Sequence, residues 1–241
     1  MSFEKRLDAQ DCICGEANSP RVTVVIPMLN EERNLPRVLP RIPATVDEIL
    51  LVDGYSTDNG IEVAKKLCPR IRVIYQDGKG KGNALRAGIA NATGDIIVTI
   101  DADGSMDPEE IPTFIAPLLA GYAYVKGSRF LSGGRTLDMP WLRRLGNRVF
   151  TILVNVLFRA KYTDLCYGYN AFGSRAFQKV SLNSDGFEIE TEMHIKAAKA
   201  RLKITEVPSF ERARLDGKTN LKTFRDGWRI LRTILWERVR G

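Results

Sequence analysis

The sequence predicts an α/β fold with a mostly parallel sheet and helices on both faces. Four short, β-branched apolar runs indicate strands that are buried on both faces, because such strands show little polar alternation. They lie at residues 22–26, 48–52, 72–75 and 95–100. Helical segments alternate with these runs, as is typical of parallel sheets. They lie at residues 32–39, 59–67 and 83–91.

A polar or turn-forming residue follows each run. Pro27 is expected to stop the first strand and Asp53 the second, and Asp58 is placed to cap the helix that follows. Ligands of open α/β sheets bind at the carboxyl ends of strands. We therefore expect the four strand-end loops to meet in one crevice. These loops begin at Pro27, Asp53, Gln76 and Asp101.

The pattern after residue 105 is less regular. It predicts helices at residues 109–120, 141–158, 188–200 and 224–239. It predicts strands at 124–129 and 204–207, and loops at 131–140 and 217–220.

Composition limits the function. With 241 residues, 44% of them hydrophobic, the chain can bury one sizeable core. The formal net charge of +7 suits phosphorylated substrates or anionic lipid. Lys and Arg are dispersed and no reading motif occurs, so nucleic acid is not an expected partner. No stretch reaches the roughly 18 apolar residues that a membrane span needs.

Residues 1–20 are expected to form a loose leader, because they have no periodic apolar pattern. They are not expected to be a secretory signal, because they lack an apolar stretch behind a basic start. The cysteines show no second pair at zinc spacing, so a reduced, cytoplasmic protein is expected. They are Cys12, Cys14, Cys68 and Cys166. The one histidine, His194, is expected to be a packing or surface residue.

Two carboxylates, Asp101 and Asp103, follow the fourth run at successive same-side positions. Such a pair forms a hard oxygen site for Mg²⁺ or Mn²⁺, and Ser105 offers a further oxygen. A plain strand-end turn is the alternative, because Asp and Gly favour turns.

Residues 79–82 precede a predicted helix and offer two lysines and helix-terminal N–H groups, which suit a diphosphate. An ordinary basic turn is the alternative. Asn30, Glu31 and Glu32 follow the first run, where they can bind ribose hydroxyls and a base N–H together with Asp53. For the two glutamates, first-turn helix charge is the alternative.

Taken in order, these segments resemble the GT-A family 2 glycosyltransferases. The matching stretches are residues 26–32 (IPMLNEE), 52–58 (VDGYSTD), 80–84 (GKGNA) with Gly88, and 100–103 (IDAD). Later residues resemble the dolichol-phosphate (polyprenol-phosphate) mannosyltransferase group. They are 127–129, Gly133, Gly134, Trp141, Arg144, Asn147, Asp164, 168–172, 208–214, Gly217, Thr219 and Leu221.

The resemblance implies a Rossmann-like GT-A catalytic domain over residues 21–222, with a nucleotide-sugar half at 21–105, an acceptor half at 106–222, and a C-terminal amphipathic helix at 223–241. The implied nucleotide-sugar contacts are Pro27, Asn30, Glu31, Glu32, Asp53, Ser56, Lys81, Asp101 and Ala102. The implied metal contacts are Asp101 and Asp103, and Ser105 is added to them as the further oxygen that the residues themselves offer. The implied acceptor contacts are Arg129, Arg144 and Arg214.

Four residues depart from the family pattern. Gly54 and Tyr55 stand where many relatives have Asp-Gly, which leaves the base open. Ser105 stands where relatives have Gln, and Asn220 replaces a frequent Lys.

The family implies inversion, with the acceptor attacking the anomeric carbon opposite the leaving diphosphate of GDP-mannose or a UDP-sugar. A polyprenyl phosphate is already an anion and needs cations rather than a base. A hydroxyl of a soluble glycan or secondary metabolite needs a carboxylate base, for which Asp164 and Glu190 are candidates. The catalytic candidates are therefore these two residues and Asp103. Glu188 and Glu192 are interpreted as a solvated helix start.

Residues 224–239 predict a basic amphipathic helix. Peripheral contact at the inner face of the membrane is one interpretation, and packing on its own domain is the commoner one. Residues 141–158 allow the same two interpretations. A Rossmann dehydrogenase is excluded because the first turn has no G-x-G-x-x-G. A non-catalytic nucleotide-sugar-binding module stays open.

Overall fold

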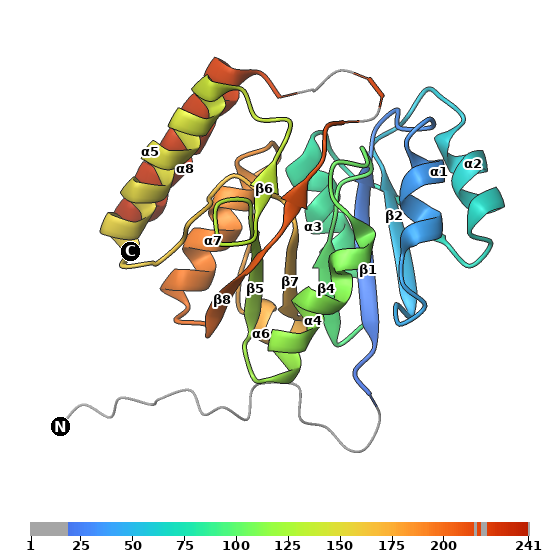
Figure 1. Ribbon diagram of the computed structural model, residues 1–241, viewed down its shortest axis with the longest axis horizontal. Coiled ribbons are helices and arrows are strands. Elements are labelled where there is room, and N and C mark those ends of the chain that lie inside the picture. Colours follow the sequence, from blue (N-terminus) through green and yellow to red (C-terminus); the bar gives the residue numbers. More distant parts are fainter. Residues whose placement is uncertain (1–18, 215, 218–220, 241) are drawn as a thin grey trace.

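The computed structural model describes residues 19–214, 216–217 and 221–240 (Figure 1). Most of the predicted leader, with Cys12 and Cys14, and most of the predicted loop at 217–220 lie outside the described residues.

A seven-stranded, mostly parallel sheet forms the centre of the fold, as the sequence predicts. Its strand order is β3-β2-β1-β4-β7-β5-β8. The strands are β1 (Val22–Met28), β2 (Glu48–Asp53), β3 (Arg72–Tyr75), β4 (Ile96–Thr99), β5 (Tyr124–Ser128), β7 (Asn170–Gly173) and β8 (Ile204–Pro208). The four strands predicted in the first half are parallel neighbours, whereas β7 runs antiparallel to both β4 and β5. A short pair, β6 (Arg135–Thr136) and β9 (Phe210–Glu211), forms a second sheet.

Helices cover both faces of the large sheet. Residues of α1 (Leu35–Val38), α2 (Gly60–Leu67) and α4 (Ile111–Leu119) share one buried apolar cluster with the sheet. Residues of α3 (Lys81–Asn91), α6 (Ser174–Phe177) and α7 (Ile189–Lys199) share a second cluster on the other face. The 3-10 turns η2 (Leu39–Arg41) and η3 (Pro108–Glu110) lie next to α1 and α4.

Two long helices form an outer layer beyond α7 (Figure 1). They are α5 (Trp141–Phe158) and α8 (Thr223–Val239). A third apolar cluster joins them to α7, with Val154 of α5, Ile195 of α7, and Ile230 and Ile234 of α8 at its centre.

Several predicted boundaries shift for local reasons. The prediction that Pro27 stops the first strand is wrong, because β1 continues to Met28. The carbonyl of Val25 accepts a hydrogen bond from the N–H of Ile100, and this is the last contact of β1 with β4. Pro27 lies two residues further along β1, so its backbone faces the same side of the strand as that of Val25. The missing N–H of Pro27 therefore faces a side where pairing has ended. The first helix begins only at Leu35, after a turn, and Pro36 lies in its first turn.

The cap of α2 also differs from the prediction, since its N-cap is Asn59. Asp58 still contributes to the start of α2, because its Oδ1 accepts a hydrogen bond from the N–H of Gly60 at 3.0 Å. Strand β7 was not predicted, and β6 falls inside the predicted loop at 131–140. The sequence Asn170–Gly173 is too short to show a strand pattern by itself.

Candidate functional site

Lys81, the first residue of α3, joins the carboxyl end of β4 to α7. Its Nζ lies 2.6 Å from Oδ1 of Asp101 and 2.6 Å from Oε1 of Glu190. Burial raises the pKa of Asp101 to about 6, the carboxylates of Asp103 and Glu190 act in the same direction, and Lys81 opposes them. Burial alone would lower the pKa of Lys81, but the carboxylates of Asp101 and Glu190 outweigh it and raise that pKa. One lysine therefore does not fully compensate the negative charge gathered here.

Asp103 is held by a second cation, Arg214. Nη2 of Arg214 lies 2.7 Å from Oδ2 of Asp103, and its Nη1 lies 3.1 Å from Oε1 of Glu31. The N–H of Ser105 donates to the other Asp103 oxygen at 2.9 Å. Burial raises the pKa of Glu31, against a hydrogen bond from Asn34. The predicted acceptor residue Arg214 thus lies beside a predicted metal carboxylate.

The donor set of Asp101 and Asp103 fits a divalent cation. Both carboxylates lie at one strand end, and each is paired with a basic side chain, so the site stabilises positive charge. Mg²⁺ and Mn²⁺ are commonly held by one or two carboxylates together with substrate phosphates. Within the described residues, no group of three or more His, Cys, Asp or Glu could hold a metal ion. Substrate oxygens would therefore have to complete the coordination.

Hydrogen bonds tie the first two strand-end loops together. Asn30 has a φ of 58°, and its N–H donates to Oγ of Ser56 at 2.9 Å. The N–H of Thr57 donates to Oδ1 of Asn30 at 2.7 Å. Asp53 is buried and accepts from the N–H of Ser56 at 3.1 Å. The left-handed backbone at Asn30, which Asn tolerates better than most residues, turns the chain so that both bonds form.

The next residues continue this contact. The N–H of Glu32 donates to Asp58 at 2.9 Å, and the N–H of Asn59 donates back to Glu32 at 3.1 Å. Pro27 is half-buried in β1, and Ala102 is buried between the two aspartates. The predicted nucleotide-sugar residues thus lie on three connected strand ends and the start of α3.

A second charged cluster lies in the acceptor half and is buried. Arg129 donates from Nε to Asp164 at 2.7 Å and from Nη2 at 2.9 Å, and its Nη1 reaches Glu211 at 2.9 Å. Asn147 of α5 donates to Asp164 at 3.0 Å. Burial alone would raise the pKa of Asp164, but Arg129 outweighs it and holds that pKa well below its usual range. Both Asp164 oxygens are occupied, which suits a partner for Arg129 better than a general base.

The other predicted residues divide between surface and interior. Arg144 is exposed on α5, with its guanidinium carbon 5.2 Å from the centre of the Phe130 ring. Glu192 is buried rather than solvated and accepts from the N–H of Ser184 at 2.7 Å. Glu188 is half-buried and accepts from the N–H of Gly186 at 3.2 Å. The interpretation of Glu188 and Glu192 as a solvated helix start is therefore wrong.

Sequence reasoning missed a pair of exposed tyrosines at the rim of the donor loops. Tyr55, just after β2, and Tyr75, at the end of β3, stack with ring centres 5.6 Å apart. They are 61% and 56% exposed, although stacked aromatic rings are costly to leave in water. The signal was present in the sequence, since both residues follow or end neighbouring parallel strands.

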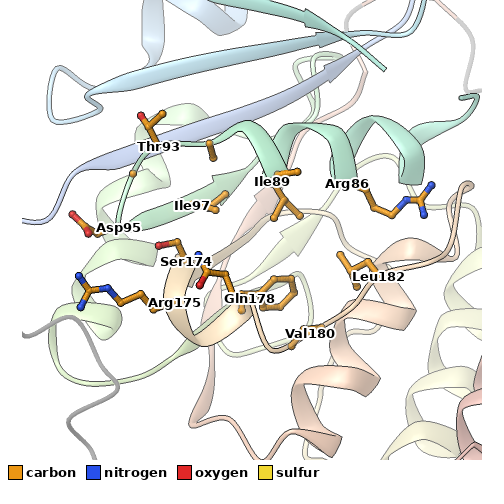
Figure 2. Close-up of a pocket in the computed structure, with 14 residues that line it drawn as sticks. Arg86, Ile89, Thr93, Asp95, Ile97, Ser174, Arg175, Gln178, Val180 and Leu182 are labelled. Atoms are coloured by element: carbon orange, nitrogen blue, oxygen red, sulfur yellow. The ribbon is translucent and has the colours of Figure 1, made fainter. Parts of the chain in front are cut away.

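A separate cavity of about 510 Å³ opens between α3 and α6 (Figure 2). Its apolar lining includes Ile89, Ile97 and Phe177, and it lies beside Asp95, at the amino end of β4. Asp101 follows the opposite end of that strand. This cavity is therefore distinct from the donor loops.

The fold and the strand-end carboxylates define a protein of the GT-A type. The glycosyl transferase family 2 model matches residues 23–181. A solved structure of glucosyl-3-phosphoglycerate synthase from Mycobacterium tuberculosis, in complex with Mn²⁺, UDP and glucosyl-3-phosphoglycerate, has the same fold. It is 23% identical, with a TM-score of 0.73, and the match covers 91% of this chain and 80% of that one.

The chain belongs to glycosyl transferase family 2. It is similar to the dolichol-phosphate mannosyltransferase of Pyrococcus furiosus, with 34% identity over 90% of this chain and 64% of that protein. It is also similar to the dolichyl-phosphate hexose transferase of Haloferax volcanii, with 32% identity over 89% of this chain and 92% of that protein. The chain spans only 59% and 54% of the lengths of two further Haloferax relatives. The predicted family and its mannosyltransferase-like pattern are confirmed.

Proposed function

We propose that the protein is an inverting glycosyltransferase that moves a hexose from a nucleotide-diphospho-sugar to a polyprenyl phosphate. One observation carries the proposal: Asp101 and Asp103, each paired with a cation, lie where three strand-end loops and the start of α3 meet. The similarity to two transferases named for dolichol or dolichyl phosphate supports the lipid acceptor. In this proposal residues 21–105 bind the donor and residues 106–222 the acceptor, apart from Arg214, which reaches Asp103 in the donor site.

The donor loops provide the nucleotide contacts. The loop pair held by Asn30 and Ser56 would bind the nucleoside, with Asp53 behind it. Tyr55 and Tyr75 offer a flat aromatic surface against which a base can stack. A GDP- or UDP-linked sugar is accommodated equally by such stacking, since every base has a π-face.

Asp101 and Asp103 would hold Mg²⁺ or Mn²⁺, with Ser105 beside them. When bound, the cation neutralises charge on the leaving diphosphate. Lys81 and Arg214 would then turn from the two aspartates toward diphosphate oxygens, because both are already within contact distance of the aspartates that hold the ion. Glu190, 2.6 Å from the Lys81 Nζ, would remain the counter-charge of Lys81 when it turns.

The acceptor half supplies cations rather than a base. Arg144 is exposed and can bind a phosphate with its guanidinium fork. Arg129 is engaged by Asp164 and Glu211, so we assign this pair to positioning the acceptor loops. Because a phosphate monoester is ionised at neutral pH, its oxygen attacks the anomeric carbon without proton transfer.

The acceptor determines where the enzyme works. A polyprenyl chain resides in a membrane, so we propose a peripheral protein at its cytoplasmic face. Within the described residues, no helix is long and apolar enough to cross a membrane.

The test is a transfer assay with radiolabelled nucleotide-sugars, Mn²⁺ or Mg²⁺, and a short-chain polyprenyl phosphate in detergent. We expect label in the organic phase and none with Asp103→Ala. Label only in the aqueous phase, with a glycan or other hydroxyl compound added, would favour the soluble-acceptor alternative. Tight donor binding without any transfer would favour a binding module.

A further inference from the structure

The outer layer formed by α5 and α8 presents large apolar side chains to solvent. On α5 these are Trp141, Leu145, Val149, Ile152 and Val156. On α8 they are Phe224, Trp228, Leu235 and Val239, while Leu142 of α5 and Trp236 of α8 are exposed beside these rows. Trp141 is 76% exposed and Phe224 is 83% exposed, which is unusual for rings of this size. The residues recur at three-, four- and seven-residue spacing, so each set forms one stripe along its helix.

Each apolar stripe lies opposite the face that its helix buries. The buried residues of α5 are Asn147, Thr151 and Val154, and those of α8 are Asp226, Ile230, Ile234 and Glu237. These inner faces already pack against one another and against α7. The fold therefore buries the inner face of each helix and leaves the apolar stripe on its outer face exposed to solvent. We call the two outer stripes the helix-pair face.

All exposed formal charges on the two helices are positive. Helix α5 has three arginines and no acidic residue. The two acidic residues of α8 are Asp226 and Glu237, and both are buried. Arg148 of α5 and Arg232 of α8 are exposed and make no hydrogen bond or ion pair within the described residues. Apolar side chains flanked by unpaired arginines are the pattern of helices that lie in the plane of an anionic membrane.

A second copy of this chain fits the face less well. Closed dimers are mostly two-fold, and a two-fold interface places each patch against itself. Arginines would then face arginines, with no exposed carboxylate on either helix to compensate.

We infer that the helix-pair face docks the protein on an anionic lipid surface through the outer stripes of α5 and α8. The helices would lie flat at the level of the lipid head groups, with Trp141 and Trp228 inserted and the arginines contacting lipid phosphates. Arg144 lies near the start of α5, with its guanidinium against the Phe130 ring. The inference deepens the proposed function, because docking there brings the membrane that carries a polyprenyl phosphate to the acceptor half.

The test measures binding of the whole chain to vesicles that contain neither nucleotide-sugar nor polyprenyl phosphate. We expect sedimentation with phosphatidylcholine vesicles that contain phosphatidylglycerol, and little with phosphatidylcholine alone. The double variant Trp141→Ser and Trp228→Ser should bind about tenfold or more weakly, since each loses an inserted indole. The matched control is Leu119→Ser, a 59% exposed apolar residue on α4.

A charge-reversal variant tests the electrostatic part. Arg148→Glu with Arg232→Glu should reduce binding to anionic vesicles at least tenfold, because each basic residue near such a surface contributes about 1 kcal/mol, roughly a fivefold change in affinity. The loss should shrink as salt is raised. Circular dichroism should show unchanged helix content, because both arginines are exposed.

Three results would overturn the inference: equal binding to neutral and anionic vesicles, no binding to either, or full binding by both variants. A dimer in sedimentation velocity that the tryptophan variant dissociates, without vesicle binding, would assign the face to a second copy. The detergent transfer assay separates this inference from the proposed function. If lipid product forms without vesicle binding, only the docking face is ruled out. If vesicles are bound but no lipid product forms, only the proposed acceptor is ruled out.

Discussion

The donor cluster around Asp101 and the acceptor cluster around Asp164 are both built from paired acidic and basic side chains, but they have different roles. In the donor cluster, Asp101 and Lys81 keep 25% and 13% of their side-chain surface exposed. In the acceptor cluster, Asp164 is fully buried and the Arg129 side chain is 4% exposed. The four-residue segment 211–214 joins the two clusters, since Glu211 pairs with Arg129 and Arg214 with Asp103.

The difference teaches which pairs a ligand can replace. A pair at a strand end that solvent still reaches can exchange its partner for a metal or phosphate. A buried pair cannot separate without leaving an uncompensated charge, which costs several kcal/mol. We therefore expect donor-cluster substitutions to reduce turnover and acceptor-cluster substitutions to reduce stability.

The largest effect is expected for Asp103→Ala. Loss of a metal-holding carboxylate should lower kcat/KM at least about 1000-fold, or about 4 kcal/mol in transition-state stabilisation. The free energy of unfolding in urea should change by less than about 1 kcal/mol, because Arg214 keeps Glu31 as a partner at 3.1 Å. Glu62→Ala, on the exposed side of α2, is the control. Turnover at the wild-type level would contradict the metal site.

The next effect is expected for Asp164→Asn. Arg129 would keep its charge in a buried site with only Glu211 as a counter-charge, so the free energy of unfolding should fall by about 3 kcal/mol. Asp185→Asn removes the carboxylate of a surface pair with Arg86, and should cost less than about 1 kcal/mol. If the two variants unfold at the same urea concentration, the contrast between the clusters is wrong.

Arg214→Ala should change metal binding in the absence of nucleotide. The guanidinium lies 2.7 Å from Asp103 and competes with a cation for that carboxylate. Its removal should tighten Mn²⁺ binding about tenfold, on the scale of one charge-assisted contact. Electron paramagnetic resonance of free Mn²⁺ measures this directly. Arg212→Ala, which pairs with Asp107, is the control and should leave the affinity unchanged.

A pH effect is expected from His194, which is buried in α7. Burial, with Lys126 adding to it, places the pKa of His194 well below its usual range. Below about pH 6.5 the unfolded chain therefore binds a proton at His194 that the folded chain does not bind. Stability should fall as pH drops below about 6.5, by up to about 1.4 kcal/mol per pH unit. His194→Phe should flatten this slope, and an unchanged slope would assign the effect to other groups.

The smallest effect is expected for Tyr55→Ala. Loss of a stacking ring should weaken nucleotide-sugar binding about fivefold to tenfold, since base stacking contributes about 1–3 kcal/mol. Isothermal titration with UDP and GDP measures the loss. Tyr122→Ala, half-buried beside Lys203 and remote from the donor loops in sequence, is the control. Equal loss in both variants would point to a general structural effect.

Much of the donor half could be predicted because its features are local. Apolar β-branched runs identify strands β1 to β4, and the residue after each run must lie at the same sheet edge if the strands are parallel. That rule alone brings Asn30, Asp53 and Asp101 to one edge. The pairing of Lys81 with Glu190, 109 residues apart, follows from no local pattern.

The acceptor half was less predictable because its elements depend on distant partners. Strand β7 is four residues long and exists only because β4 and β5 lie on either side of it. Asp164 carries the same side chain as a catalytic base, and only the position of Arg129 shows that both its oxygens are engaged. Glu192 resembled a solvated helix start until the fold placed the loop before α7 against it.

By itself, the sequence determined the class of fold, the family, and the strand-end positions of Asp101 and Asp103, because periodicity and motif order are properties of neighbouring residues. Only the tertiary structure decided which cation each carboxylate meets, which arginine is buried, and that α5 and α8 bury one stripe and expose another. These outcomes depend on contacts between residues far apart in the chain. The physical reason is that a charge or an apolar side chain has no fixed role until the fold determines what desolvates it and what compensates it.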